Sequence, residues 1–225
     1  MGASKRNEVD VARGKCYACY RPLSSCMCKH VRAIQTNTKF VILMHPKEFQ
    51  KVKNGTGHLT HLSLPNSELY VGVDFRDHRR VNALLCDSSK RCYVLYPGED
   101  SLLLNERKIE CEGKELVIFI IDATWSTALK LLKVSTNLQA LPKLSFTHTK
   151  SSQFQIKQQP EEAYLSTIES TLTILELLNE HKMESIQQSE FKHFLDPFKA
   201  MIAYQIACIA ESNSSHKNAV RFKKR

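Results

Sequence analysis

The sequence has no apolar run long enough to cross a membrane. Its longest one, residues 116–121, is far shorter than the ~20 apolar residues of a membrane-spanning helix. The polar start lacks the apolar core of a secretory signal. Glycine and proline are few, at 7 each in 225 residues, which excludes collagen-like and linker-like chains. With 42% hydrophobic residues, we expect a globular, cytoplasmic protein without a membrane segment.

Acidic residues are missing from two stretches of a chain whose formal net charge is +9. Residues 11–47 contain seven Lys and Arg, residues 212–225 contain five, and neither stretch has an Asp or a Glu. Basic stretches attract polyanions, because binding releases counterions from the phosphates. The charge therefore favours nucleic acid as a partner. A solvated tail and a charged loop would have the same composition, so charge alone leaves both interpretations open.

Four of the eight cysteines lie within thirteen residues, in the pattern C-x2-C-x6-C-x-C. They are Cys16, Cys19, Cys26 and Cys28. Closely spaced pairs of thiolates suit the tetrahedral coordination of zinc, and four protein ligands leave no open position for catalysis. We therefore expect a structural zinc knuckle. An iron–sulfur cluster uses the same ligands and is the main alternative.

Short apolar runs alternate with segments of helical spacing. Strands are predicted at residues 39–44, 69–73, 92–96, 116–121 and 143–147. Helices are predicted at residues 79–85 and 126–134, after a start signal at Pro160, and from Asp196 onward. This alternation indicates an α/β fold with a mostly parallel central sheet. The apolar stripe of the last helix, from Phe198 to Ile209, is interpreted as core.

The expected organisation has four parts. They are a disordered N-terminus (1–12), the zinc knuckle (13–35), the α/β domain (36–211) and a basic, disordered C-terminal tail (212–225).

Unusual polar residues follow three of the predicted strands. They fall at residues 96–100, at Asp122 to Trp125, and in the connection 147–160. Ligands in open α/β sheets bind outside the carboxyl ends of the strands, so these residues form the candidate site. Two simpler readings remain: Asp122 could cap the next helix, and Trp125 could be a core aromatic. Common nucleotide, protease and esterase motifs, such as G-x-G-x-x-G and G-x-S-x-G, are absent.

A series of motifs resembles the DTW-domain family, named for a D-x-T-W motif. The series runs from the cysteine knuckle through residues 43–48, 56–59, 64–66, 95–100, 122–125, 152–160 and 165–169. The family usually has glycine at the place of Ala123, and arginine at the places of His58, Gln155 and Lys157. Lysine keeps the charge of arginine but loses its bidentate fork, so the family's contacts carry over to Lys157 less directly.

The resemblance implies a SPOUT-like fold with a C-terminal trefoil knot that binds S-adenosylmethionine. It also implies a tRNA-uridine aminocarboxypropyltransferase, which moves the 3-amino-3-carboxypropyl group of S-adenosylmethionine to uridine N3 and releases 5′-methylthioadenosine. Asp122 is expected to act as the catalytic base or to orient the substrate amino group. The residues expected to bind S-adenosylmethionine are Tyr96, Pro97, Gly98, Glu99, Asp122, Thr124, Trp125, Ser152, Ser166 and Thr167.

Basic residues near these motifs are expected to contact tRNA phosphates. They are Lys29, Arg32, Lys47, Lys130, Lys133 and Lys157. We expect a monomer or a homodimer. Two other functions fit the same residues: an RNA methyltransferase that uses the same cofactor, and a zinc-knuckle RNA-binding protein without catalysis.

Overall fold

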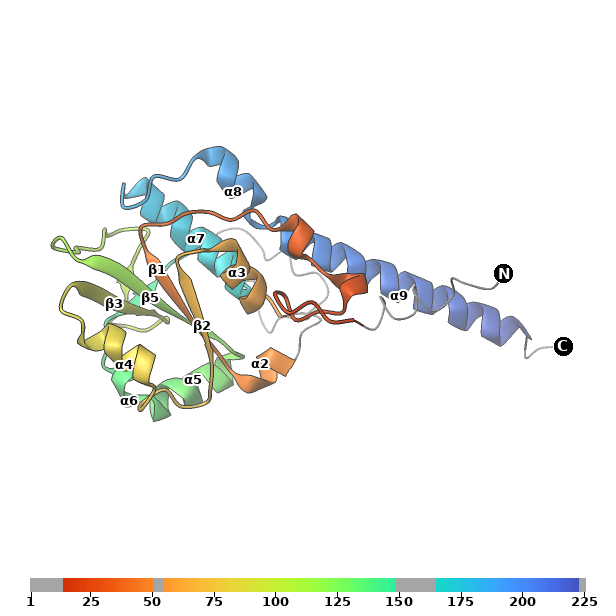
Figure 1. Ribbon diagram of the computed structural model, residues 1–225, viewed down its shortest axis with the longest axis horizontal. Coiled ribbons are helices and arrows are strands. Elements are labelled where there is room, and N and C mark those ends of the chain that lie inside the picture. The colour runs from red at the N-terminus through yellow and green to blue at the C-terminus, as the bar shows by residue number, and fades with distance from the viewer. Residues whose placement is uncertain (1–13, 51–54, 149–164, 223–225) are drawn as a thin grey trace, which may run out of the picture.

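Six parallel strands form the centre of the protein (Figure 1). The computed structural model describes residues 14–50, 55–148 and 165–222, the last eleven as backbone only. The strands are β1 (Lys39–Met44), β2 (Ser67–Val71), β3 (Lys90–Leu95), β4 (Leu102–Leu103), β5 (Glu115–Asp122) and β6 (Lys143–Ser145). Their order in the sheet is β2-β1-β5-β3-β6-β4. The predicted α/β fold with a parallel sheet is confirmed.

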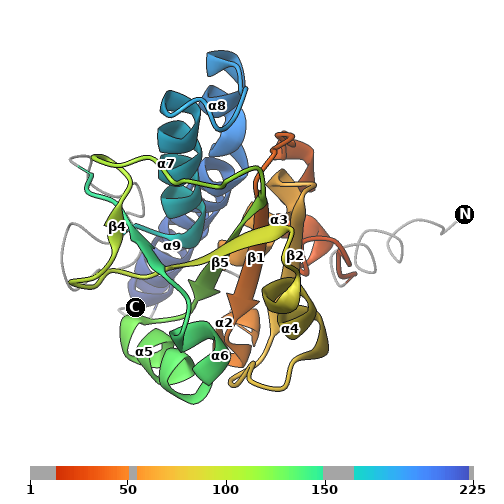
Figure 2. The same ribbon diagram turned by 90° about the vertical axis from the view of Figure 1, so that its left-hand side faces the viewer.

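Helices cover both faces of this sheet (Figure 2). They are α2 (Pro46–Gln50), α3 (Gly57–Ser63), α4 (Arg79–Cys86), α5 (Trp125–Val134), α6 (Thr136–Gln139), α7 (Thr167–Glu180), α8 (Gln188–Phe194) and α9 (Asp196–Phe222). Two 3-10 turns, η1 (Leu23–Ser25) and η2 (Cys28–His30), belong to the N-terminal knuckle. Helices α3, α7, α8 and α9 pack on one face and α4 to α6 on the other.

The central strands are apolar on both sides because both of their faces are covered. In β5, Ile118 and Ile120 point to the α7 side, whereas Val117 and Phe119 point to the α4 side. This alternation follows from the two-residue repeat of a strand. It explains why the longest apolar run of the sequence became a central strand and not part of a helix.

The C-terminal third differs from the prediction in two ways. Helix α7 begins at Thr167, well after Pro160, so Leu165 precedes the helix. The reason is a capping box: Glu169 accepts hydrogen bonds from the backbone N–H and the hydroxyl of Ser166, at 2.9 and 2.6 Å. Residues 160–164, which carry the predicted start signal, lie outside the described residues.

Helix α9 is longer and more exposed than predicted. It continues to Phe222, through most of the stretch 212–225 that was expected to be a separate tail. Phe198 and Met201 are buried, but Ile206 and Ile209 are 46% and 50% exposed, because this part of α9 extends away from the sheet (Figure 1). The apolar stripe is therefore core only over its first turns.

The predicted SPOUT-like knot stays a prediction, because residues 149–164 lie outside the described residues. Residues 1–12, predicted to be disordered, also lie outside them. Among the described helices, none is both long enough and apolar enough to span a membrane.

A network of charges at the edge strand β2 makes stability depend on pH. Arg80 donates to both carboxylate oxygens of Glu68, at 3.0 and 2.7 Å, and Lys39 lies 3.5 Å away. The hydrogen bonds from Arg80 first, then that from the Tyr70 hydroxyl, and the charges of Arg80 and Lys39 lower the pKa of Glu68 from 4.5 to about 2.

Because the folded pKa is lowered, the stabilisation by Glu68 is complete above pH 4.5 and is lost as the pH falls toward 2. We expect Glu68→Gln to destabilise the protein at pH 7, and we expect the difference from the parent chain to shrink below pH 4.5. Urea unfolding at several pH values measures it. A difference that does not change with pH would contradict this account.

Candidate functional site

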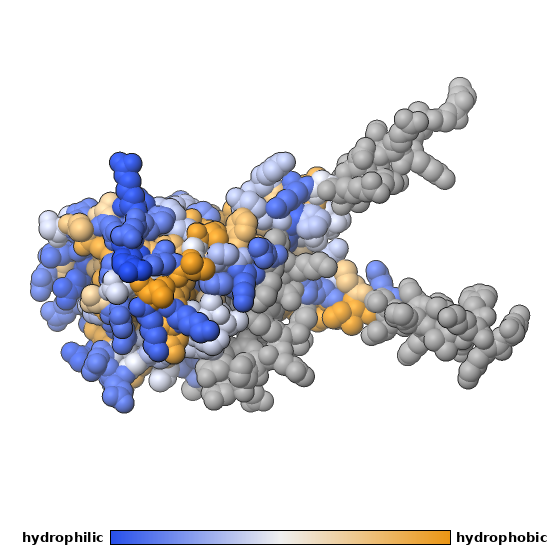
Figure 3. Space-filling view, turned by 90° about the horizontal axis from the view of Figure 1, so that it is seen from below, coloured by the Kyte–Doolittle hydropathy of each residue, from blue (hydrophilic) through white to orange (hydrophobic). Residues whose placement is uncertain are grey.

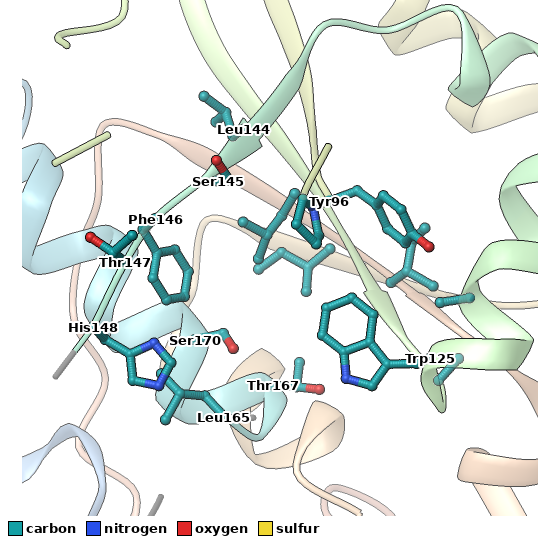
Figure 4. Close-up of a pocket in the computed structure, with 16 residues that line it drawn as sticks. Tyr96, Trp125, Leu144, Ser145, Phe146, Thr147, His148, Leu165, Thr167 and Ser170 are labelled. Atoms are coloured by element: carbon teal, nitrogen blue, oxygen red, sulfur yellow. The ribbon is translucent and has the colours of Figure 1, made fainter. Parts of the chain in front are cut away.

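A cavity of about 430 Å³ opens at the carboxyl ends of three adjacent strands, β5, β3 and β6. These are the strands whose following residues form the candidate site in the sequence. The start of α7 closes the cavity on another side. Its wall is mainly apolar and aromatic, as is usual for small-molecule sites. The main lining residues are Tyr96, Trp125, Phe146, His148, Leu165 and Thr167 (Figure 4).

The rings of Tyr96 and Trp125 form one wall of the cavity. Their centroids are 6.0 Å apart and the rings are inclined by 61°. Trp125 is the first residue of α5 and 46% exposed, so the alternative of a core tryptophan is wrong. Burial raises the pKa of Tyr96, so the phenol stays neutral. Phe146 and His148 stand across the cavity from Trp125 (Figure 4).

Asp122 ends β5 and is only 7% exposed. The hydroxyl of Thr167, the first residue of α7, donates to Oδ1 of Asp122 at 2.6 Å. On its other side the carboxylate touches Gly57, the first residue of α3, so closely that a methyl group at Gly57 would overlap Oδ2. The N-cap of α5 is Thr124, so the alternative that Asp122 caps this helix is wrong. Two helix starts and a strand end therefore fix the carboxylate. Asp122 does not itself line the cavity, but its chain neighbours Ile121 and Ala123 and its hydrogen-bond partner Thr167 do.

Of the other residues expected to bind a cofactor, some line this cavity and others do not. Pro97 and Thr167 line it, together with Tyr96 and Trp125. Thr124 is exposed and its hydroxyl donates to that of Thr127 at 2.8 Å.

Gly98 and Glu99 lie in an exposed turn beyond Pro97, where the hydroxyl of Ser101 donates to the Gly98 carbonyl at 2.7 Å. Ser166 hydrogen-bonds Glu169 and does not line the cavity, and Ser152 lies outside the described residues.

Several lining residues were not predicted from the sequence. Phe146 and His148 follow β6, and Ser170 lies three residues after Thr167 on α7. The Nε2 atom of His148 is buried and has no hydrogen-bond partner among the described residues. Ser170 can be predicted to line the cavity once the start of α7 is known, because Thr167 and Ser170 are three residues apart and share a helix face. The polar connection 147–160 was part of the candidate site, but Phe146 and His148 were not named as binding residues.

The four cysteines of the N-terminal knuckle come together as the spacing predicts. All four sulfur atoms lie within 4.8 Å of one another, with Cys16 to Cys28 and Cys19 to Cys26 at 3.7 Å. A tetrahedron with metal–sulfur bonds of about 2.3 Å has sulfur–sulfur edges of about 3.8 Å. The cluster could hold one metal ion. An iron–sulfur cluster places its thiolates farther apart, because they bind different iron atoms.

Positive charge compensates the thiolates. Arg21 is 2% exposed, and burial lowers its pKa, while the neighbouring Cys19, Cys28 and Cys26 favour the charged guanidinium. Burial also raises the pKa of Cys28, so a thiolate at this position needs a cation beside it. A buried cation next to a site for four thiolates is the arrangement expected around a metal centre with excess negative charge.

The basic residues predicted to contact RNA lie on the surface. Lys29, Arg32, Lys47, Lys130 and Lys133 are exposed, and Lys157 lies outside the described residues. On α5 the two lysines stand among exposed apolar residues, Leu129 and Val134. Figure 3 looks onto this side of the molecule, where hydrophilic and apolar residues are mixed.

Known proteins resemble this chain over most of its length. A tRNA-uridine aminocarboxypropyltransferase 2 from Mus musculus is 29% identical over 214 residues, covering 93% of this chain and 69% of the relative. A protein of the same name from Macaca fascicularis is 27% identical over 213 residues, with the same coverage. The Drosophila melanogaster protein of this name is 30% identical over 172 residues, covering 74% of this chain and 67% of its own. No solved structure matches.

The family model described as the DTW domain matches residues 13–206. The match includes the knuckle, Asp122 with Trp125, and the start of α7. It therefore covers both the cysteine cluster and the cavity. The chain belongs to the DTW-domain family.

Proposed function

We propose that this protein transfers the 3-amino-3-carboxypropyl group of S-adenosylmethionine to N3 of a uridine in tRNA. The observation that carries the proposal is the buried carboxylate of Asp122, fixed by Thr167 and Gly57 beside an aromatic-walled cavity. The relatives named for this activity support the same reaction. S-adenosylmethionine acts as the group donor.

The side chains that line the cavity suit the chemistry of the donor. Its wall of Tyr96, Trp125 and Phe146 offers ring surfaces to a flat base and to a positively charged sulfonium. The hydroxyls of Thr167 and Ser170 and the ring of His148 supply polar contacts at its edge. We propose that Tyr96, Pro97, Trp125 and Thr167 bind the donor directly, and that Gly98, Glu99, Thr124, Ser152 and Ser166 complete the surrounding loops.

Asp122 acts as the general base. Its carboxylate takes the proton of uridine N3–H while N3 forms a bond to the carbon next to the sulfonium. The sulfur–carbon bond breaks, its electron pair stays on sulfur, and 5′-methylthioadenosine leaves as a neutral thioether. The hydrogen bond from Thr167 fixes the direction of the carboxylate. Placing this carbon, and not the methyl carbon, in line with N3 selects the transferred group.

The four-cysteine knuckle holds one structural zinc ion in this proposal. Its four sulfurs match one tetrahedral ion and leave no open position, so the metal takes no part in the transfer. The knuckle spans residues 13–35 and the transferase domain residues 36–211.

The target base must leave its stack for N3 to reach the cavity. Exposed lysines then hold the tRNA backbone; Lys130 and Lys133 are exposed on α5, the helix that begins with the cavity residue Trp125. We expect the double substitution Lys130→Ala and Lys133→Ala to weaken tRNA binding. We also expect the slope of log K against log salt to fall by about 1 to 2, because each phosphate contact contributes about 0.9. Binding titrations at several salt concentrations measure this slope, and an unchanged slope would remove these lysines from the interface.

The transferred group can be identified with two labelled forms of the donor. One carries the label in the methyl group and the other in the carboxyl carbon of the aminocarboxypropyl group. We expect tRNA to take up the carboxyl label only. Uptake of the methyl label would show a methyltransferase, and RNA binding without uptake of either label would show a non-catalytic binding protein.

A further inference from the structure

We propose that the metal knuckle positions the catalytic carboxylate. Tyr20 and Arg21 of the knuckle contact the segment 55–58 and thereby hold Gly57 against Asp122. This inference rests on the role proposed above for Asp122. It assigns to two successive knuckle residues a part in the reaction, although neither lines the cavity.

Arg21 holds the segment on one side. Its Nη2 donates to the carbonyl oxygen of Gly55 at 2.9 Å and lies 3.0 Å from the sulfur of Met201 on α9. Arg21 follows the buried cysteine Cys19 by two residues and is itself 2% exposed. Its guanidinium therefore connects the knuckle to the backbone two residues before Gly57.

Tyr20 holds the segment on the other side. Its ring lies 4.7 Å from the ring of His58 and 5.3 Å from that of Phe49, centroid to centroid. His58 is 4% exposed, and burial, with the charge of Arg21 nearby, lowers its pKa to about 4, so it packs as a neutral ring. His58 directly follows Gly57 and Gly55 lies two residues before it, so the knuckle contacts the chain on both sides of Gly57.

The backbone of Tyr20 is the second observation. Its φ is +59°, in the left-handed region that glycine adopts without cost and residues with a Cβ avoid. Such strain persists only where surrounding contacts compensate for it, and it is typical of functional sites. The contacts present here include those of the ring with His58 and Phe49, and the ammonium of Lys15 lies 5.3 Å from the ring centroid. The ring, and not the backbone turn, is therefore the reason for a tyrosine at this position.

Gly57 connects the segment held by the knuckle to the carboxylate of Asp122. Its Cα lies so close to Asp122 that even a methyl group would displace the carboxylate. Movement of the segment 55–58 would thus move the wall that faces Oδ2, while the Thr167 bond to Oδ1 would remain. A misplaced base lowers the rate of transfer without removing the donor-binding cavity.

Tyr20→Gly tests the proposal, because it relieves the backbone strain and removes only the ring. We expect kcat at saturating tRNA to fall by about 10- to 100-fold. We expect donor affinity, read from the fluorescence of the single tryptophan Trp125, to stay close to that of the parent chain. Tyr20→Phe keeps the ring and is expected to restore kcat. Tyr17→Gly is the matched control, since Tyr17 is in the same knuckle but 85% exposed.

Two further measurements do not depend on activity. The absorption spectrum of the cobalt(II)-substituted knuckle should be the same in Tyr20→Gly and in the parent. Hydrogen exchange at the amide of Thr60, which donates to the carbonyl of Thr56 at 2.9 Å, should become faster in Tyr20→Gly only.

Unchanged exchange and unchanged kcat in Tyr20→Gly would overturn the proposal, as would an equal loss of kcat in Tyr17→Gly. Failure of the proposed reaction would appear differently, as a parent chain that modifies no tRNA. The exchange rates at Thr60 would then still show whether the knuckle holds the segment.

Discussion

Replacing Asp122 by Asn is expected to lower the rate of tRNA modification by about 100- to 10,000-fold, the usual contribution of a general base. Asparagine has nearly the same shape and can still accept the hydrogen bond from Thr167, which now reaches Oδ1 at 2.6 Å. It cannot take a proton from uridine N3. Single-turnover rates at saturating donor and tRNA measure the effect on the chemical step alone.

Binding measurements separate this effect from damage to the site. Titration of the Trp125 fluorescence should show that Asp122→Asn still binds S-adenosylmethionine, because the aromatic wall is unchanged. Thr167→Ser, which keeps the hydroxyl, serves as the matched control for Thr167→Val, which releases Oδ1. We expect Thr167→Val to lose part of the rate and Thr167→Ser to retain it. Normal turnover of Asp122→Asn would rule out the base.

Loss of the metal is the second change with a large expected effect. Cys19 is fully buried at the centre of the knuckle, and Cys19→Ser leaves three thiolates for a tetrahedral ion. Structural zinc contributes about 10–16 kcal/mol to the folding of isolated zinc-finger peptides. If about 4 kcal/mol of this contributes to the free energy of unfolding of the whole protein, its loss lowers Tm by about 8–16 °C for a chain of this length.

Elemental analysis and thermal unfolding test this expectation together. The parent should contain one zinc per chain, and a strong chelator should lower its Tm as much as Cys19→Ser does. Cys86→Ser is the matched control, because Cys86 is an exposed cysteine at the end of α4, outside the cluster. An equal Tm in all three chains would show that the cysteines hold no structural metal, and iron in the protein would identify the alternative centre.

The sequence predicts those parts of the fold that depend on long apolar runs. All five predicted strands are present, because a run of consecutive apolar residues such as 116–121 suits a strand covered on both faces. The order of the strands is not readable in this way. The sequence could therefore name three strand ends, but only the pairing of β3 with β5 and β6 brings them to one cavity.

Short elements were missed for a physical reason. β4 has two residues, and α2, α3 and α8 have five to seven, which is too few for a periodic pattern to stand out. Their positions depend on tertiary contacts. Gly57 shows the consequence: its sequence neighbours give no reason for a glycine, and only the close approach of Asp122 does.

The start of α7 was a different kind of error. The Ser166-x-x-Glu169 capping box is a readable start signal, whereas the predicted start rests on Pro160, since proline favours the first position of a helix. The sequence does not predict that the later part of α9 extends beyond the sheet. Its apolar stripe continues to Ile206 and Ile209, although the surface that buries it ends at Ile202.

Nucleoside mass spectrometry of tRNA tests the central claim most directly. The tRNA is taken from cells that lack this gene and incubated with the purified chain and unlabelled S-adenosylmethionine. The account predicts a new 3-(3-amino-3-carboxypropyl)uridine and an equal amount of 5′-methylthioadenosine, both absent with Asp122→Asn. A methylated nucleoside with S-adenosylhomocysteine, or tRNA that stays unmodified, would contradict it.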